Sequence, residues 1–241
     1  MVSCFLLIGC NPEGRQINSP FFTVLEHHKT GLDFSNTLTP SDSLNMFNYM
    51  YFYNGAGIGA GDFNNDGLID LFFASNQNNN KLFINKGNLK FTEVTANAAI
   101  PQSRGWSTGV SVVDINNDGW MDLVIAGKWM SISFVLNDKG SFENSKATEI
   151  PETAGLWNVL HTVDIDDDGD IDSFIGSEHG SMFFENTSMA SIPYFGGGMA
   201  FGSSNVMGGY NRTPVFVDID GDGDLDAFVG KQNYYGESDG T

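Results

Sequence analysis

Four stretches of this sequence place oxygen-bearing side chains at regular positions around a glycine. The last of them is Asp218-Ile-Asp220-Gly-Asp222-Gly223-Asp-Leu-Asp226, with carboxylates at positions 1, 3, 5 and 9 and glycine at position 6. The alternation directs every second carboxylate towards one centre, and the glycine permits a sharp turn beneath it. Carboxylates this crowded need a hard cation that takes six to eight oxygen ligands, and Ca²⁺ is the usual one. The stretch therefore predicts a calcium-binding loop.

The same nine-residue pattern occurs three more times, at residues 62–70, 114–122 and 164–172. The first aspartates of the four loops lie 52, 50 and 54 residues apart, so the pattern belongs to an internal repeat. Positions 1, 3, 5 and 9 would bind through side chains, and position 7 through its backbone carbonyl. The predicted ligands of up to four structural Ca²⁺ ions are Asp62, Asn64, Asp66, Leu68 and Asp70; Asp114, Asn116, Asp118, Trp120 and Asp122; Asp164, Asp166, Asp168, Asp170 and Asp172; and Asp218, Asp220, Asp222, Asp224 and Asp226.

These loops differ from an EF-hand, which begins with the same residues. An EF-hand has a bidentate glutamate at position 12 and lies between two helices. Here position 12 holds apolar residues typical of buried strands, and the last ligand stands at position 9, so we predict a tight turn between two strands. The residues at position 12 are Phe73, Ile125, Ile175 and Val229.

The loops also differ from one another in charge. Loops three and four have four carboxylates each, whereas loops one and two have Asn64 or Asn116 at position 3. Because more negative ligand sets generally bind Ca²⁺ more tightly, we predict tighter binding in loops three and four.

The whole chain of 241 residues is strongly acidic, with a formal net charge of −19. Fourteen of its 30 acidic residues stand at the predicted side-chain ligand positions 1, 3, 5 and 9, and four bound Ca²⁺ ions would leave a net charge of −11. This balance argues against nucleic acid and anionic membrane surfaces as partners. A hydrophobic content of 41% indicates a globular protein rather than a disordered one.

Short apolar runs rich in Val, Ile and Phe flank every loop and predict strands. An aromatic residue (Trp106, Trp157 or Tyr210) precedes three of the loops by seven or eight residues. The runs before the loops are 57–60, 109–113, 159–163 and 214–217, and those after them are 71–74, 123–126, 173–176 and 227–230. Further strands are predicted in the first two repeats at 82–84, 90–94, 133–136 and 141–143.

A period of roughly 50 residues with about four strands and no helical pattern is typical of one blade of a β-propeller. The predicted fold is therefore an all-β propeller of four-stranded blades. Only 15 residues follow Asp226, so the last blade lacks its outer strands in sequence. Predicted strands at 21–25 and 46–53 would complete it in a closed ring of four or five blades. The alternative is a fragment of a larger, for example seven-bladed, propeller.

The chain divides into three parts on this reading. Residues 1–10 form a signal or lipobox segment, 11–53 an N-terminal segment, and 54–241 the repeats. Leu7-Ile8-Gly9-Cys10 resembles a bacterial lipobox, which would make Cys10 the lipidated residue and the only link to a membrane. No Lys or Arg precedes this short run, so an ordinary buried strand or a misplaced start codon is the alternative.

Two blocks of the sequence, residues 57–70 and 218–230, resemble FG-GAP repeats of the VCBS type. Such repeats form the propellers of integrin α-subunits and occur in many bacterial surface proteins. The resemblance covers about residues 54–230, while residues 20–100 resemble the start of bacterial proteins related to cartilage acidic protein. Those proteins often end in an ASPIC/UnbV domain, which is not visible here. The resemblance implies a Ca²⁺-stabilised β-propeller outside the cytoplasm that serves adhesion or ligand binding.

No motif of an enzyme active site stands out. His161 and His179 have no identifiable nucleophile or carboxylate partner in sequence, and the adjacent His27 and His28 would face opposite sides of a strand end. We therefore predict a non-catalytic module for binding or adhesion, secreted or lipid-anchored to the bacterial cell envelope, with a protein or glycan ligand. The alternative is an accessory propeller of a secreted carbohydrate-active or other enzyme. The glycine-rich stretch 193–209 is either a plain insertion or a loop that contacts the ligand.

Overall fold

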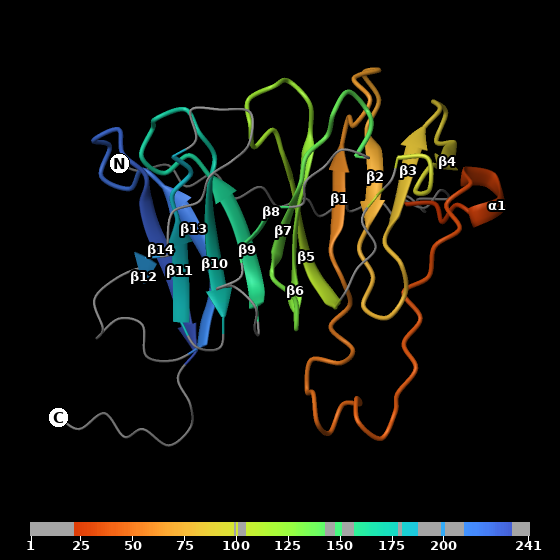
Figure 1. Cartoon of the computed structure of the whole chain (residues 1–241), viewed down its shortest axis with the longest axis horizontal. Coiled ribbons are helices and arrows are strands. Elements are labelled where there is room, and N and C mark those ends of the chain that lie inside the picture. The colour runs from red at the N-terminus through yellow and green to blue at the C-terminus, as the bar shows by residue number, and fades with distance from the viewer. Residues whose placement is uncertain are drawn as a thin grey trace, which may run out of the picture.

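The computed structural model is an all-β protein, as predicted (Figure 1). It describes residues 22–98, 100, 105–142, 148–150, 157–177, 180–187, 199–200 and 210–232. Within these residues the chain has 14 strands and a single helix, α1 (His27–Thr30), of four residues. No helix in the described ranges is long and apolar enough to span a bilayer.

The strands form three four-stranded sheets and one two-stranded sheet, each built from consecutive antiparallel strands. This arrangement is consistent with propeller blades, and we refer to the sheets as blades one to four. Blade one contains β1 (Ile58–Gly61), β2 (Asp70–Phe73), β3 (Lys81–Asn85) and β4 (Phe91–Glu93). Blade two contains β5 (Trp106–Val113), β6 (Asp122–Lys128), β7 (Ile132–Val135) and β8 (Thr148–Ile150). Blade three contains β9 (Trp157–Val163), β10 (Asp172–Ser177), β11 (Gly180–Phe184) and β12 (Met199–Ala200), and blade four contains β13 (Tyr210–Val217) and β14 (Asp226–Gln232).

The blades stand side by side, with the first strand of each contacting the first strand of the next (Figure 1). Glycines permit the closest of these approaches. A Cβ atom at Gly59 or Gly61 would lie 2.6 Å from a methyl carbon of Val112 on β5, so neither position has room for a side chain. The glycine pattern of β1 is therefore required by the packing of blade two.

The hydrophobic core lies between neighbouring blades. Phe63 and Phe72 of blade one pack with Leu123, Ile125 and other buried residues of blade two. A second cluster joins blades two and three through residues that include Ile115, Val124, Phe134 and Phe184. Blade two thus presents one side to blade one and the other side to blade three.

The prediction of strands at 21–25 and 46–53 was wrong for the residues that the structure describes. Residues 22–26 have no regular structure, His27 and His28 lie in α1, and 46–53 form turns. The polar neighbours of the aromatic run explain this result. Asn45 Oδ1 accepts a hydrogen bond from Phe47 N, and Asn48 Oδ1 accepts one from Asn45 N, both at 2.8 Å. Such local bonds occupy the backbone groups that a sheet would need.

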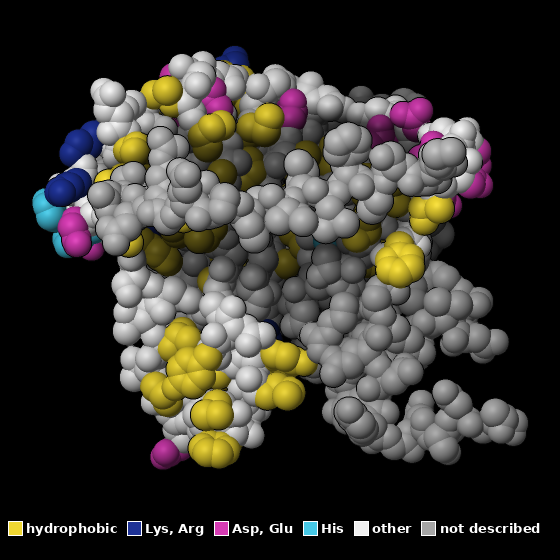
Figure 2. Space-filling view, turned by 180° about the vertical axis from the view of Figure 1, so that it is seen from behind, with side chains coloured by type: hydrophobic (Ala, Val, Ile, Leu, Met, Phe, Trp, Pro, Cys, Tyr) yellow, Lys and Arg dark blue, Asp and Glu magenta, His cyan; other side chains and the backbone are white. Residues whose placement is uncertain are grey.

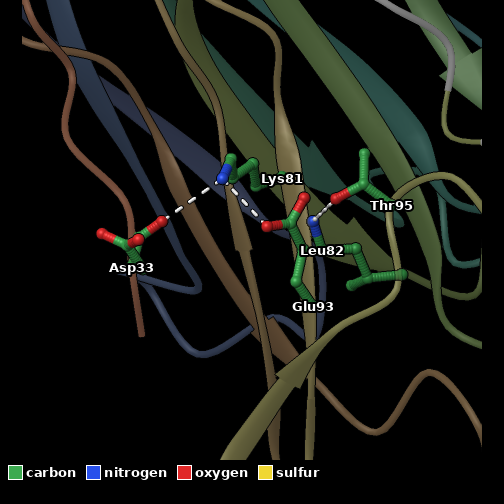
Figure 3. Close-up of polar contacts among 5 residues, drawn as sticks. All are labelled: Asp33, Lys81, Leu82, Glu93 and Thr95. Carbon is green, nitrogen blue, oxygen red and sulfur yellow. Dashed lines mark hydrogen bonds and ion pairs between the residues drawn. The ribbon is translucent and has the colours of Figure 1, made fainter. Parts of the chain in front are cut away.

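This N-terminal segment is attached to blade one by polar contacts. Asn36 binds Asn76 through both amide atoms, accepting from its backbone N–H at 3.1 Å and donating to its Oδ1 at 2.6 Å. Lys81 of β3 donates to the backbone carbonyl of Asp33 at 3.3 Å and pairs with Glu93 of β4 at 2.9 Å (Figure 3). The segment therefore lies along the outer part of blade one without adding a strand to it.

One further strand was misplaced. Residues 141–143 were predicted as the last strand of blade two, but residues 141 and 142, the described part of this stretch, contain only an isolated bridge from Ser141 to Asp138. The strand that pairs with β7 is β8, at residues 148–150.

Candidate calcium loops

The four predicted loops connect the first and second strands of the four blades, and all lie at one end of the molecule, uppermost in Figure 1. Loop two is in direct contact with both loop one and loop three. Asn65 Nδ2 of loop one donates to the carbonyl of Gly119 in loop two at 3.1 Å, and Asn117 Nδ2 of loop two donates to the carbonyl of Gly169 in loop three at 2.9 Å. Both asparagines stand at position 4 of their loops.

The backbone of each loop is left-handed at positions 4 and 6. Position 6 is always glycine, as predicted, with φ between 84° and 103°. Position 4 holds Asn65, Asn117, Asp167 or Gly221, with φ between 54° and 78°. Asn, Asp and Gly are the residues that tolerate this conformation best, so a second signal for the turn was present in the sequence.

The aspartate at position 1 closes the turn through backbone donors. In loop two, Asp114 Oδ1 accepts from Asp118 N at 3.0 Å and Asp114 Oδ2 accepts from Gly119 N at 2.7 Å. Loop one makes the same two bonds, and loops three and four keep the bond to the glycine at position 6. The position-1 carboxylate is thereby held over the centre of the loop.

The carboxylate at position 5 accepts a hydrogen bond from the backbone N–H of position 7. This bond occurs in every loop and fixes where the two predicted ligands lie. The donors and acceptors are Leu68 and Asp66 at 2.9 Å, Trp120 and Asp118 at 2.9 Å, Asp170 and Asp168 at 2.9 Å, and Asp224 and Asp222 at 3.0 Å.

The aspartate at position 9 joins the loop to the sheet. Asp122 is wholly buried, and its Oδ2 accepts from Ile115 N at 3.0 Å while its Oδ1 accepts from Asn137 N at 2.6 Å. Asp70 and Asp172 are equally buried and make the same pair of bonds. Because each carboxylate oxygen has a second lone pair, these bonds leave room for a cation.

Position 3 divides the loops into two kinds. In loops one and two, the amide of Asn64 or Asn116 donates to the position-5 carboxylate at 3.0 or 3.1 Å. In loops three and four, position 3 is Asp166 or Asp220, which has no proton to donate when ionised. In the loops with asparagine, the position-3 amide thus stabilises the negative charge of the position-5 carboxylate. In the loops with aspartate, position 3 adds a second negative charge instead.

Loops three and four also bring three carboxylates together. Oxygen atoms of the grouped aspartates lie within 4.8 Å of one another in each loop, and loops one and two contain no such group among the described residues. The groups are Asp164, Asp166 and Asp172 in loop three, and Asp218, Asp220 and Asp222 in loop four. In loop four, Asp226 accepts from Ile219 N at 2.9 Å, as Asp172 accepts from Ile165 N in loop three.

Loop three contains a second sign that a cation fits. Asp164 Oδ1 is buried, and within the described part of the chain it has no hydrogen-bond partner. A buried carboxylate oxygen without a donor is costly, and a hard cation at the centre of the loop would satisfy it. Oxygen donors of this kind are those that Ca²⁺ prefers.

Comparison with known protein families finds the FG-GAP-like repeat twice, at residues 62–125 and 114–175. Each match begins at the first aspartate of a loop and ends within the second strand of the following blade. The chain carries FG-GAP-like repeats.

The chain is also similar in sequence to cartilage acidic protein 1 of three species. The chain is 24% identical to cartilage acidic protein 1 of Xenopus tropicalis over 186 residues, which is 73% of this chain and 28% of that protein. It is also 24% identical to cartilage acidic protein 1 of Mus musculus and of Homo sapiens, over 51% of this chain. The chain thus spans less than a third of the length of these relatives.

The FG-GAP-like repeats contain one repeated residue that the sequence analysis missed. Asn85, Asn137 and Asn186 lie at the last residue of the third strand or two residues after it, and each donates its backbone N–H to the position-9 aspartate of its own blade. Asn137 Nδ2 also donates to the carbonyls of Phe63 and Met121 at 2.8 and 3.0 Å, which links loops one and two. The signal was an asparagine 14 or 15 residues after position 9 in the first three repeats.

The buried position-9 carboxylates are unusual acids. Burial raises the pKa of Asp122 to about 7 and that of Asp172 to about 6. Burial also raises the pKa of Asp70, although backbone N–H donors act against it. Nearby carboxylates raise these pKa values further, from positions 1 and 5 in loops one and two and from positions 3 and 5 in loop three, and a bound cation would lower them.

Other residues named from the sequence lie elsewhere. His161 is half-buried on β9 beside Phe216, with ring centroids 6.3 Å apart, and burial lowers its pKa. This apolar setting gives no support to a catalytic role. Cys10, His179 and most of the stretch 193–209 lie outside the described residues.

Proposed function

We propose that this protein is a non-catalytic binding module that acts outside the cytoplasm and is stabilised by Ca²⁺ in the loops of its FG-GAP-like repeats. FG-GAP repeat proteins are often extracellular modules for binding or adhesion. The similarity to cartilage acidic protein 1 favours the same location. Lipid anchoring through Cys10 remains part of this proposal.

The observation that carries the calcium proposal is the site in loop three. Three carboxylates converge there, and Asp164 Oδ1 is buried without a hydrogen-bond partner in the described chain. Asp164, Asp166 and Asp172 would hold the ion, with Asp168 at position 5 and the carbonyl of Asp170 completing the predicted set. The bound ion would supply positive charge at the point where these oxygens meet.

The same geometry explains why calcium would stabilise the fold rather than serve only as cargo. Position 9 belongs to the second strand and its oxygens are bonded to the loop and to the end of the third strand. An ion bound between position 1 and position 9 would therefore connect three parts of one blade. The proposed role is a clamp, repeated from blade to blade.

The end opposite the calcium loops offers a surface for a ligand. Tyr49 and Phe52 are buried against Trp106, and Lys128 Nζ lies 3.6 Å from the centroid of the Tyr49 ring. Around this rigid base, hydrophobic side chains are exposed at the lower end of Figure 2, over the segment that precedes β1. Met46, Phe47, Met50 and Tyr53 of this segment are exposed, and so is Trp129, which lies between β6 and β7 with its ring centroid 5.7 Å from that of Tyr49. Aromatic residues and methionine are enriched in protein interfaces.

A thermal melt in Ca²⁺ and in chelator tests the calcium proposal. Each site held at a hundred times its Kd would add about 2.7 kcal/mol to the free energy of unfolding. For a chain of this size each kcal/mol raises Tm by about 2–4 °C. We expect chelation to lower Tm and Ca²⁺, but not Mg²⁺ at equal concentration, to restore it. An unchanged Tm would refute the structural role.

The binding proposal needs a separate test. Panels of extracellular proteins and glycans would be probed with the wild type and with Phe47→Ala and Trp129→Ala. We expect a ligand that is bound and released unchanged, and that both substitutions weaken. Chemical conversion of a glycan would instead support the alternative of an enzyme-associated propeller.

A further inference from the structure

Blade four exposes the side of its sheet that the other blades bury. Val215 and Val217 on β13 are 54% and 44% exposed, Ile219 in loop four is 65% exposed, and Phe228 on β14 is 66% exposed. We call these four residues the blade-four face. Such a contiguous set of exposed apolar side chains is uncommon on a soluble monomer.

The repeat shows what normally covers this side. Ile115 and Val124 of blade two stand at the positions that Ile219 and Phe228 occupy in blade four, and both are buried against blade three. Ser111, the equivalent of Val215, contacts Thr162 of blade three, with 2.7 Å between the two hydroxyl oxygens. The blade-four face is therefore the side that receives a following blade.

The opposite side of each blade is also defined by the repeat. Residues two and four positions before the first aspartate face the preceding blade. Val110 and Val112 pack there against the glycines of β1, and Phe216 packs against Phe174 with centroids 5.5 Å apart.

In blade one the equivalent residues are Ile58 and Ala60, and both are exposed, Ile58 by 63%. We call these two residues the blade-one face. Phe34 of the N-terminal segment stacks on Phe73 farther out on the same sheet and leaves the first strand uncovered. The described blades therefore form an arc with an unpaired face at each end.

We propose that the blade-four face of one copy binds the blade-one face of a second copy, head to tail. The chain carries both halves of an interface that already joins its own blades three times. A second copy brings the β-branched and small residues that the repeat uses at this contact. None of the six side chains carries a charge, so the contact requires no buried ion pair. Because the two faces differ, the association is heterologous and leads to a closed ring or to a longer chain.

Sedimentation over a range of protein concentrations, in Ca²⁺ and at least physiological salt, would test this proposal. We expect the mass of the wild type to rise with concentration. Phe228→Glu and Ile58→Glu each place a charge in the contact and should weaken association by at least about tenfold. Phe22→Glu is the matched control, because Phe22 is 92% exposed and lies outside both faces, and it should associate like the wild type.

A mixing experiment sharpens the test. Phe228→Glu keeps an intact blade-one face, and Ile58→Glu keeps an intact blade-four face. An equimolar mixture should therefore form a 1:1 dimer and no larger species, although each variant alone is monomeric. Val217→Glu repeats the experiment at a second residue of the same face, so that a folding defect in one variant does not decide the result.

Two results would overturn the proposal. A wild type that stays monomeric at all concentrations, with a cooperative melt showing that it is folded, would exclude the contact. An Ile58→Glu variant that associates as the wild type does would show that the blade-one face takes no part.

Discussion

Loops two and three have nearly the same backbone conformation but differ in how their carboxylates are arranged. At position 4 the backbone φ is 55° in loop two and 57° in loop three. In loop two, however, Asn116 donates to Asp118 at 3.1 Å, whereas the equivalent Asp166 joins a group of three carboxylates. The turn is therefore set by glycine and backbone hydrogen bonds, while position 3 sets how strongly the loop needs a cation. Loop one resembles loop two in this respect, and loop four resembles loop three.

The largest expected effect lies at position 9, where the two kinds of loop are alike. Asp122→Ala and Asp172→Ala would each leave two backbone N–H groups without their acceptor in the interior. We expect each substitution to lower the free energy of unfolding by about 3 kcal/mol, even without Ca²⁺. Denaturant titration in chelator measures this loss. Asp122→Asn and Asp172→Asn, which keep one acceptor oxygen, should cost less.

If the two alanine variants lost very different amounts of unfolding free energy in chelator, position 9 would not have the same role in loops two and three. It would mean that the position-9 aspartate holds the sheet together in one kind of loop and only the ion in the other.

Exchanging position 3 between loops two and three should produce the next largest effect. Asp166→Asn removes one carboxylate from loop three, and Asn116→Asp adds one to loop two. We expect the first to weaken and the second to strengthen Ca²⁺ binding at the altered loop by on the order of tenfold, or about 1.4 kcal/mol. Calorimetric titration of both variants and of the double exchange measures this. If Asp166→Asn left every site unchanged, position 3 would not determine affinity.

The pH dependence of stability should change sign with Ca²⁺. In the ion-free protein, burial raises the pKa of Asp122 to about 7, whereas an unfolded aspartate has a pKa of 3.8. The folded chain binds the proton more tightly, so the free energy of unfolding should rise by less than about 1 kcal/mol as pH falls from 8 to 6.5. With Ca²⁺ bound, the same change should lower stability, because protons compete with the ion.

Denaturant titrations of ion-free and Ca²⁺-saturated protein at the two pH values would measure both slopes. The window ends at pH 6.5 because His161, whose pKa burial lowers, acts in the opposite direction as pH falls further. Equal slopes with and without Ca²⁺ would show that these carboxylates do not meet the ion.

The smallest expected effect is on the cooperativity of Ca²⁺ binding between neighbouring loops. Asn117 Nδ2 donates to Gly169 O at 2.9 Å and to Asp170 Oδ1 at 3.1 Å, so it connects loop two to loop three. We expect Asn117→Ala to reduce any cooperativity between these two sites by about 1 kcal/mol or less. Asp167, at position 4 of loop three, has no amide to donate, and Asp167→Ala is the matched control. Calorimetric binding curves that are unchanged for Asn117→Ala would show that the contact transmits nothing.

The repeats were predictable because their local and tertiary signals agree. Apolar runs, turn glycines and ligand spacing all recur with the same period, and the loops and first two strands of each blade followed from them. The segment 46–53 was mispredicted because its aromatic residues resemble a strand, while Asn45 and Asn48 bind the backbone locally. Asn137 was missed because its partners, Phe63 and Asp122, lie in different loops that only the packing of blades brings together.

Trp120 allows the difference between the loops to be measured directly. It stands at position 7 of loop two, where the other loops have Leu68, Asp170 or Asp224. Tb³⁺, a common substitute for Ca²⁺, emits when it binds beside an excited indole, so the emission would report loop two alone. Trp120→Phe should abolish the signal and serves as the control.

The decisive experiment titrates Tb³⁺ into ion-free protein while heat and indole-sensitised emission are recorded together. The first two equivalents should release heat with little emission as loops three and four fill, and emission should rise only afterwards. Emission that rises with the first equivalent, or a titration without heat or emission, would contradict the account.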